Sequence, residues 1–194
     1  MERCHDCIIP VAGYSRRMKA WKPALPWGDA TILAAVIDAA LGAGCRVIVA
    51  GGWNYVRLRE LTAGRPQVKT IYADGWEQGM DVTVKRALEY RLSDRFFVTP
   101  GDMPLIRSQD YRRLETAASK PVVRPVFHGH PGHPVLLSEL AAQRILESAD
   151  GTPLREVIKN LETGVVEWDH AGVIRDFDDP QTYRRFSGVE DGAE

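Results

Sequence analysis

Two short apolar runs constrain the fold of this chain more than any other feature of its sequence. They are CIIPVA at residues 7–12 and RVIVA at residues 46–50. Such continuous runs are typical of strands that a parallel sheet buries on both faces. Between them, TILAAVIDAALGAG repeats apolar residues at helical spacing, with Thr31 placed as an N-cap and Gly42 and Gly44 at its end. Together these segments predict a strand–helix–strand unit.

The same alternation continues along the rest of the chain and predicts an α/β fold. We expect a three-layer αβα, Rossmann-like domain with a mostly parallel, mixed sheet. A chain of 194 residues can bury one sizeable core, so we predict a single domain over residues 1–188 and a frayed tail over 189–194. The expected helices lie at about 53–62, 80–92, 108–118, 138–148 and 152–160. The expected strands lie at 68–73, 95–102, 121–127 and 132–137, with short strands in GVVEW and VIRDF.

Charge balance and the lengths of the apolar runs exclude several classes of protein. A formal net charge of −1 gives no overall basic field for nucleic acid. The apolar runs are far shorter than a membrane span, and the first residues, MERCHDC, do not resemble a signal peptide. We therefore expect a cytoplasmic protein that binds neither nucleic acid nor membranes.

The number of cysteines also favours the cytoplasm, which is a reducing compartment. The three cysteines are an odd number for a disulfide framework. Cys4 and Cys7 flank His5 in a CxxC pattern, but a structural zinc site would want a second pair, and only Cys45 remains. The favoured interpretation is two thiols at the edge of the first strand, and a metal or redox role is the alternative.

A local cluster of cations follows the first predicted strand. Residues 11–23 read VAGYSRRMKAWKP, with Gly13 followed by four basic residues, Arg16, Arg17, Lys19 and Lys22. A glycine after a buried strand lets the backbone approach a ligand, and its N–H groups together with Arg and Lys favour anions. Neither the P-loop nor the GxGxxG fingerprint is present. The loop predicts a triphosphate site of another type, with a plain solvated loop as the alternative.

An acidic residue follows a later predicted strand. In FFVTPGDMPLI, Asp102 stands in a Pro-Gly loop at the carboxyl end of the strand, and ligands bind at that end of such sheets. A carboxylate there can hold Mg²⁺, which prefers oxygen ligands and shares them with phosphate. The alternative is an ordinary turn residue.

These motifs resemble those of the MobA-like nucleotidyltransferases. AGxSxRMxxxK, formed by Ala12, Gly13, Ser15, Arg17, Met18 and Lys22, resembles their LAAGxSxRMGxxK signature. GDMP resembles the metal-binding GDxP motif, and VIRDFDDPQTY resembles the DIDTPEDY segment. Pro10 and Val11 replace the leading Leu-Ala, and Lys19 replaces a glycine. The resemblance is greatest to the molybdenum cofactor cytidylyltransferase branch, and it implies a fold like that of nucleotide-diphospho-sugar transferases.

The resemblance implies roles for individual residues. Catalytic roles fall to Arg17, Lys22 and Asp102, with Mg²⁺ held by Asp102 and by Asp178, which we prefer to Asp176 and Asp179. YADGWEQGMDVTVKRAL resembles the family's NxxWxxGMSxSLxxGL stretch. The implied nucleotide-binding residues are Ala12, Gly13, Ser15, Arg16, Arg17, Lys22, Gly79, Met80 and Thr83.

An acceptor pocket is implied by a further motif. RPVFHGHPGHPVLLS resembles PxxxGxxGHPVL, which places Gly132, His133 and Pro134 beside the acceptor. His128, His130 and His133 suggest a zinc cluster as an alternative, although a tight Gly-Pro loop explains the glycines without metal. ADGTPLREV departs from the GDxGAR of the cytidylyltransferase branch, so that Leu154 and Arg155 remain candidates to face the acceptor.

The implied reaction is the Mg²⁺-dependent transfer of CMP from CTP to molybdopterin, with release of pyrophosphate. Ala12 favours CTP, because the guanylyl branch carries glycine there. The product would pass to a molybdenum hydroxylase. The alternatives are guanylyl transfer to the same acceptor, cytidylyl or uridylyl transfer to a sugar or polyol phosphate, and a non-catalytic nucleotide- or cofactor-binding protein.

Overall fold

The computed structural model describes residues 5–15, 18 and 20–187. In this part of the chain an eight-stranded sheet has the order β10-β7-β9-β6-β1-β4-β5, and β8 pairs with β7 beside this path. The strands are β1 (Asp6–Val11), β4 (Arg46–Gly51), β5 (Val68–Tyr72), β6 (Phe96–Val98), β7 (Val122–Phe127), β8 (His130–Pro131), β9 (Val135–Leu137) and β10 (Thr163–Glu167).

The sheet is mixed but mostly parallel, which confirms the predicted fold class. β1 runs parallel to both β4 and β6, β4 to β5, and β7 to β10. β9 is antiparallel to its two neighbours, β6 and β7, and β8 is antiparallel to β7. The reversal at β9 brings the loop between β8 and β9 to the edge where β1 and β6 end.

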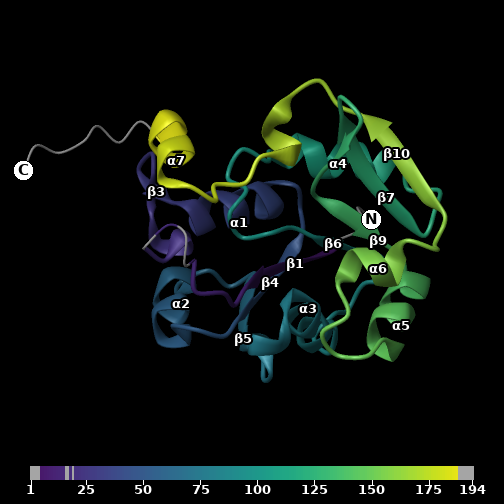
Figure 1. Cartoon of the computed structure of the whole chain (residues 1–194), viewed down its shortest axis with the longest axis horizontal. Coiled ribbons are helices and arrows are strands. Elements are labelled where there is room, and N and C mark those ends of the chain that lie inside the picture. Colours follow the sequence, from purple (N-terminus) through teal and green to yellow (C-terminus); the bar gives the residue numbers. More distant parts are fainter. Residues whose placement is uncertain (1–4, 16–17, 19, 188–194) are drawn as a thin grey trace, which may run out of the picture.

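Helices cover both faces of the sheet, as Figure 1 shows. On one face α1 (Ile32–Gly42), α2 (Tyr55–Thr62) and α4 (Ser108–Thr116) contribute to one apolar cluster. On the other face, α3 (Met80–Leu88), α5 (Glu139–Glu147) and α6 (Leu154–Ile158) contribute to a second. The last helix, α7 (Pro180–Ser187), lies beyond the sheet and packs Tyr183 against the cluster of Met18, Ile32 and Phe177.

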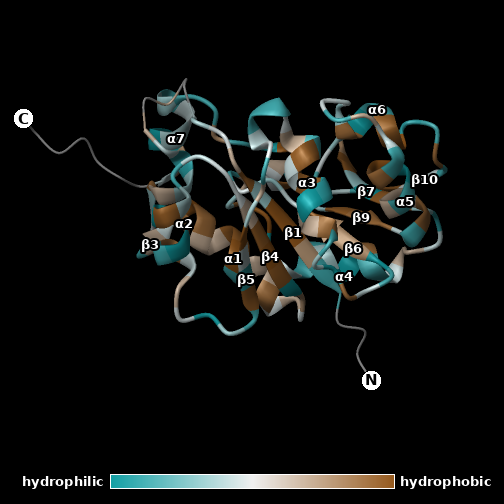
Figure 2. Ribbon diagram, turned by 90° about the horizontal axis from the view of Figure 1, so that it is seen from below, coloured by the Kyte–Doolittle hydropathy of each residue, from teal (hydrophilic) through white to brown (hydrophobic). Residues whose placement is uncertain are grey.

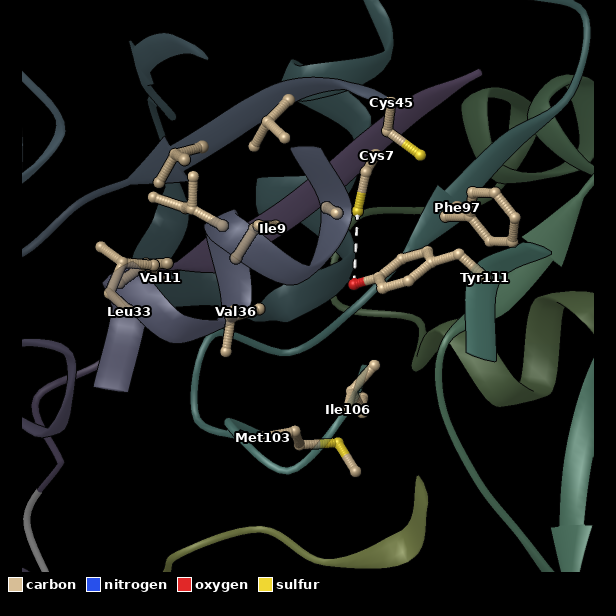
Figure 3. Packing of buried hydrophobic residues seen from close by; sticks show 14 of the residues in the cluster. Cys7, Ile9, Val11, Leu33, Val36, Cys45, Phe97, Met103, Ile106 and Tyr111 are labelled. Carbon is tan, nitrogen blue, oxygen red and sulfur yellow. Dashed lines mark hydrogen bonds between the residues drawn. The ribbon is translucent and has the colours of Figure 1, made fainter. Parts of the chain in front are cut away.

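Strand β1 supplies alternate side chains to the two clusters, because successive residues of a strand point to opposite faces. Cys7, Ile9 and Val11 belong to the cluster on the α1 side, whereas Ile8 belongs to the other. Figure 3 shows the first three beside the side chains of α1. Figure 2 shows the hydrophobic strands in the middle of the molecule and hydrophilic residues on the outer turns and helix faces.

The thiol of Cys7 is a core group. It lies within hydrogen-bonding distance of the Thr99 hydroxyl at 3.7 Å. It lies 4.0 Å from the Tyr111 hydroxyl, the contact that Figure 3 marks. Burial raises the pKa of this thiol to about 12. Cys7 therefore stays protonated and has no nucleophilic role, while Cys4 lies outside the described residues.

The prediction of a strand in VIRDF is wrong. Part of this segment forms η4 (Ala171–Ile174), and the rest crosses the end of the sheet as a loop. The carbonyl oxygen of Val173 accepts a hydrogen bond from the His133 amide at 2.7 Å. Val173 is therefore buried beside the loop before β9, and Phe177 is buried in the cluster with Met18 and Ile32, so neither belongs to a strand ladder.

Several smaller elements complete the fold. Thr31 caps α1 as predicted, because its side chain accepts a hydrogen bond from the Ala34 amide. The sequence patterns did not predict the short hairpin of β2 (Pro26–Trp27) and β3 (Ala30–Thr31). Single turns occur at η2 (Lys22–Ala24) and η3 (Trp76–Gln78). Within the described residues, none of the helices is both long and apolar enough to cross a membrane.

Candidate active site

Loops after neighbouring parallel strands meet at one edge of the sheet. β1 lies between β4 and β6 and runs parallel to both, so the segments after these three strands leave the sheet at the same edge. In open α/β sheets, ligands bind outside the carboxyl ends of the strands. The predicted triphosphate loop and the loop that carries Asp102 therefore share the edge where a ligand is expected.

Lys22, the first residue of η2, places its ammonium group between two carboxylates. Its Nζ donates one hydrogen bond to Asp102 Oδ2 at 2.7 Å and another to Asp178 Oδ1. Burial lowers the pKa of Lys22, but the charges and hydrogen bonds of the two aspartates outweigh burial and raise it. The ammonium group therefore stays charged at physiological pH.

Ser15 holds the loop that carries Lys22. Its hydroxyl accepts a hydrogen bond from the Lys22 amide at 3.2 Å, and its carbonyl oxygen accepts one from the Met18 amide at 3.0 Å. Ser15 has a φ of 53°, a left-handed backbone that few residues other than glycine adopt. Met18 packs against Phe177, the residue before Asp178. The first loop is thus joined to the C-terminal acidic segment.

The other two C-terminal aspartates differ in their surroundings. Burial raises the pKa of Asp176, and the negative charges of Asp178 and Asp102 raise it further. Asp179 instead turns to α7, where its carboxylate accepts a hydrogen bond from the Thr182 amide at 2.8 Å. Asp179 is therefore a helix cap, and the role of Asp178 as the second metal ligand stays a prediction.

Two carboxylates facing one cation are a suitable donor set for Mg²⁺. Among the residues that the structure describes, no group of three or more His, Cys, Asp or Glu side chains is arranged to hold a metal ion. Mg²⁺ usually takes only one or two carboxylates and completes its shell with waters and substrate phosphates. Asp102 and Asp178 fit this pattern, because both contact the same Lys22 ammonium group.

Three hollows share lining residues at this edge, and Met80 lines all of them. The glycine-loop cavity, about 450 Å³, is lined by Pro10, Ala12, Gly13, Tyr14, Trp76, Glu77, Gly79, Met80 and Thr83. The carboxylate cavity, about 460 Å³, is lined by Met80, Pro100, Asp102, Met103, Pro131, Gly132, His133, Ile174, Asp176 and Asp178. The arginine cavity, about 560 Å³, is lined by Gln78, Gly79, Met80, Asp81, Val98, Arg124, His133, Val135, Gly151, Pro153, Leu154, Arg155 and Ile158.

Most of the predicted site residues gather around these cavities. The glycine-loop cavity brings the first loop together with the start of α3. There the Thr83 hydroxyl donates a hydrogen bond to the Gly79 carbonyl oxygen at 3.3 Å, so that Thr83 supports the turn as well as lining the cavity. Pro134 is buried and lines none of the three cavities. Arg16, Arg17 and Lys19 lie outside the described residues, and their phosphate-binding role stays a prediction.

His133 lines both the carboxylate cavity and the arginine cavity. Its Nδ1 lies 3.5 Å from the Val98 carbonyl oxygen at the end of β6. Burial lowers the pKa of His133 to about 4, with a smaller contribution from the charge of Arg124. His133 is therefore neutral at physiological pH and has one ring N–H donor and one acceptor.

Gly132 allows the loop before β9 to pack against η4. A β-carbon at this position would lie 2.3 Å from the Val173 carbonyl oxygen, which belongs to the backbone and cannot rotate away. We predict that Gly132→Ala destabilises the fold by roughly 1–3 kcal/mol, the usual cost of overpacking, and lowers turnover because His133 shifts. Chemical denaturation measures the first effect. Gly164→Ala is the matched control, since its β-carbon would meet neighbours only at 3.5 Å or more, and equal losses in both variants would contradict the prediction.

The structure adds two residues to the site: Arg124, which sequence reasoning missed, and Trp76, which matched the family motif but was not assigned a role. Arg124 is the one arginine within the predominantly apolar strand β7, and that isolated charge was the signal that could have found it. Trp76 lines the glycine-loop cavity and packs directly on Gly52, where a β-carbon would lie 2.1 Å from the indole ring. Nothing in the spacing of Trp76 and Gly52 indicates that contact.

A glycine-containing loop after the first strand, with a lysine between two acids that follow other segments, is the arrangement that the sequence motifs predict for an NTP-dependent nucleotidyltransferase. The comparison with known families agrees. The MobA-like NTP transferase domain matches residues 7–165, and this chain belongs to that family. The protein is therefore an enzyme, a nucleotidyltransferase, as the sequence motifs predicted.

Individual relatives give the same result. The chain is 32% identical over 178 residues to the molybdenum cofactor cytidylyltransferase of Escherichia coli (strain K12), covering 92% of this chain and 93% of that protein. A nucleotidyl transferase from Methanothermobacter thermautotroptrophicus superposes with a TM-score of 0.83 at 19% identity, covering 95% and 96% of the two chains. Rv0371c from Mycobacterium tuberculosis H37Rv, solved in complex with manganese, gives 0.81 at 18% identity, covering 97% and 100%. At these identities the two structures show the fold alone.

Proposed function

We propose that this enzyme transfers CMP from CTP to the phosphate of molybdenum-loaded molybdopterin and releases pyrophosphate. The observation that carries the proposal is Lys22 held between Asp102 and Asp178, two carboxylates that line the carboxylate cavity. The likeness to a molybdenum cofactor cytidylyltransferase over nearly the full length of both chains supports the choice of substrates.

The proposed roles of the residues follow from their positions in the site. Nucleotide phosphates are proposed to bind at the backbone of Gly13 and Ser15 and at the Lys22 ammonium group, with Arg16 and Arg17 as further cations. Lys22 contributes a permanent positive charge, and stabilising the charge of the leaving pyrophosphate lowers the barrier. Because the attacking phosphate oxygen is already ionised at neutral pH, no side chain has to remove a proton from it.

Mg²⁺ is proposed as the metal of this site, held by Asp102 and Asp178. When bound, it would neutralise negative charge on phosphate oxygens. The rest of catalysis is positioning, as is general for phosphoryl transfer. The acceptor is proposed to enter along Gly132 and His133, which line the carboxylate cavity.

Ala12 is proposed to favour cytosine over guanine, since it lines the glycine-loop cavity. One methyl group changes discrimination by roughly tenfold. We therefore predict that Ala12→Gly shifts the ratio of kcat/KM for CTP and GTP by about tenfold toward GTP. Ser15→Ala is the comparison variant, because it removes a hydrogen bond within the loop but does not enlarge the glycine-loop cavity, which Ser15 does not line. An equal shift in both variants would contradict a specific role for Ala12.

The deciding experiment measures pyrophosphate release with Mg²⁺, molybdenum-loaded molybdopterin and each of CTP, GTP, ATP and UTP. Release with CTP supports the proposal, and release with GTP alone assigns the guanylyl alternative. Release only with a sugar or polyol phosphate in place of molybdopterin assigns the other transferase alternative. Nucleotide binding without release with any acceptor would assign a non-catalytic binding protein.

The place of the reaction in the cell follows from the same proposal. The product, a cytosine dinucleotide form of the cofactor, would pass to a molybdenum hydroxylase. The cytoplasm is the proposed compartment, because three cysteines are an odd number for a disulfide framework. Neither nucleic acid nor a membrane is a proposed partner.

A further inference from the structure

Arg124 is a half-buried cation with little compensation. It lies on β7, and its side chain lines the arginine cavity. Its Nε is buried and has no hydrogen-bond partner among the residues that the structure describes. Its Nη2 donates one long hydrogen bond, 3.4 Å, to the Gly132 carbonyl oxygen. Burial lowers the pKa of Arg124, with no opposing cause resolved.

The single carboxylate that lines the arginine cavity does not neutralise Arg124. That residue is Asp81, whose Oδ2 accepts a hydrogen bond from the Gly151 amide at 2.8 Å. Asp81 thereby fixes the loop before α6, which Lys85 holds as well through Ser148 and Asp150. Within the described residues, no salt bridge involves Arg124.

An uncompensated charge in a partly buried position costs stability. Such a cost is recovered when a ligand brings the missing negative charge, since a charge-assisted hydrogen bond to a guanidinium is among the strongest polar contacts. The neighbouring His133 is neutral, so it does not compete with Arg124 for an anion. The side chain of Arg155 adds a second, 84% exposed cation to the lining of the same cavity.

The remaining walls of the cavity describe the body of its ligand. Val98, Val135, Leu154 and Ile158 make most of the lining apolar. Met80 and His133 line this cavity and the carboxylate cavity as well. One molecule can therefore place a phosphate beside Asp102 and extend an apolar or flat body toward Arg124.

We propose that Arg124 determines acceptor specificity by binding an anionic or electron-rich group at the non-reacting end of the acceptor. The chemical class is a phosphate ester that carries a second negative or acceptor-only group, separated from its phosphate by a largely apolar body. This inference rests on the proposed function, because it assigns the arginine cavity to the acceptor of that reaction. It selects against simple sugar phosphates, which have neither the apolar body nor the second charge.

Arg124→Met tests the inference, because methionine keeps an apolar stem of similar width without the charge. We expect the KM for molybdenum-loaded molybdopterin to rise roughly 30-fold or more, the effect of removing one partner of a buried charge pair, while the KM for CTP is unchanged. The free variant should also have a higher Tm than wild type, since an uncompensated buried charge is gone. A purely structural arginine would instead lower the Tm and impair both substrates.

Two further variants separate the role of the Arg124 guanidinium from the general effect of losing an arginine. Arg124→Lys keeps the charge without the planar fork and should recover only part of the acceptor affinity. Arg113→Met is the matched control: Arg113 stacks on Trp168 at 4.2 Å and donates to the Glu167 carbonyl oxygen at 2.7 Å. It should lower the Tm and leave the KM for the acceptor unchanged. An unchanged acceptor KM in Arg124→Met would overturn the inference.

Failure of the proposed function is distinguishable from failure of this inference. If wild type releases no pyrophosphate with molybdopterin, the proposed acceptor is wrong, and the anion site is then tested by direct binding. Sulfate at low ionic strength is the probe, measured by calorimetry on wild type and on Arg124→Met. Loss of one sulfate site in the variant keeps Arg124 as an anion site, and identical sulfate binding overturns it.

Discussion

Pyrophosphate release is expected to fall by roughly 10³-fold when Asp102 is replaced by asparagine, at the upper end of what removing one charge-stabilising group costs. Asp102 is one of two carboxylates that contact the Lys22 ammonium group. Asparagine keeps the size and one acceptor oxygen but removes the charge that a divalent cation needs. Because chemistry rather than nucleotide recognition is lost, kcat should fall while the KM for CTP changes little.

Metal affinity provides the second measurement for Asp102→Asn. Mn²⁺ binding in the presence of CTP, followed by electron paramagnetic resonance, should weaken in parallel with kcat. Asp179→Asn is the matched control, since Asp179 caps α7 through the Thr182 amide and does not line the carboxylate cavity. Turnover of Asp102→Asn at the wild-type rate would show that the site does not hold the catalytic metal.

Lys22→Met is expected to combine a large loss of activity with a loss of stability that Mg²⁺ reverses. Without the ammonium group, the carboxylates of Asp102 and Asp178 face each other with less compensation. Breaking a fully buried pair costs about 3–5 kcal/mol, and these acids are partly exposed, with 25% and 30% of their side-chain surface accessible. We therefore expect a destabilisation of roughly 1–3 kcal/mol in metal-free buffer, below the fully buried range.

The response to Mg²⁺ distinguishes this explanation from a general packing defect. A divalent cation between the two carboxylates replaces the missing charge, so Mg²⁺ should raise the Tm of Lys22→Met more than that of wild type. Turnover should stay roughly 10²–10³-fold below wild type even when stability is restored, because the positive charge beside the phosphates is still missing. Lys159→Met, at a pair exposed on the surface, is the control and should show neither effect. If Mg²⁺ does not raise the Tm of Lys22→Met, repulsion between the two carboxylates is not the cause of its instability.

Periodicity in the sequence was enough to predict most of the fold. The apolar runs of β1 and β4 and the helical spacing of α1 each reflect local burial, and the polarity of each side chain indicates whether its position is buried. Strand direction is a property of pairs, and nothing within residues 135–137 indicates that β9 is antiparallel to both neighbours. The error at VIRDF has the same origin, because the composition of a buried segment does not show whether that segment pairs with a neighbouring strand.

For the candidate site, the sequence by itself determined which residue types follow which strands. The glycine and serine of the first loop, Lys22, Asp102 and the acidic C-terminal segment all stand in recognisable motifs, because their chemistry depends on local backbone geometry. Only the tertiary structure decided that Lys22 lies between Asp102 and Asp178, which are 80 and 156 positions away along the chain. It also decided that Asp179 caps a helix and that the buried Nε of Arg124 has no hydrogen-bond partner in the part of the chain that the structure describes. The physical reason is that charge compensation depends on distance in space, which the order of residues along the chain does not specify.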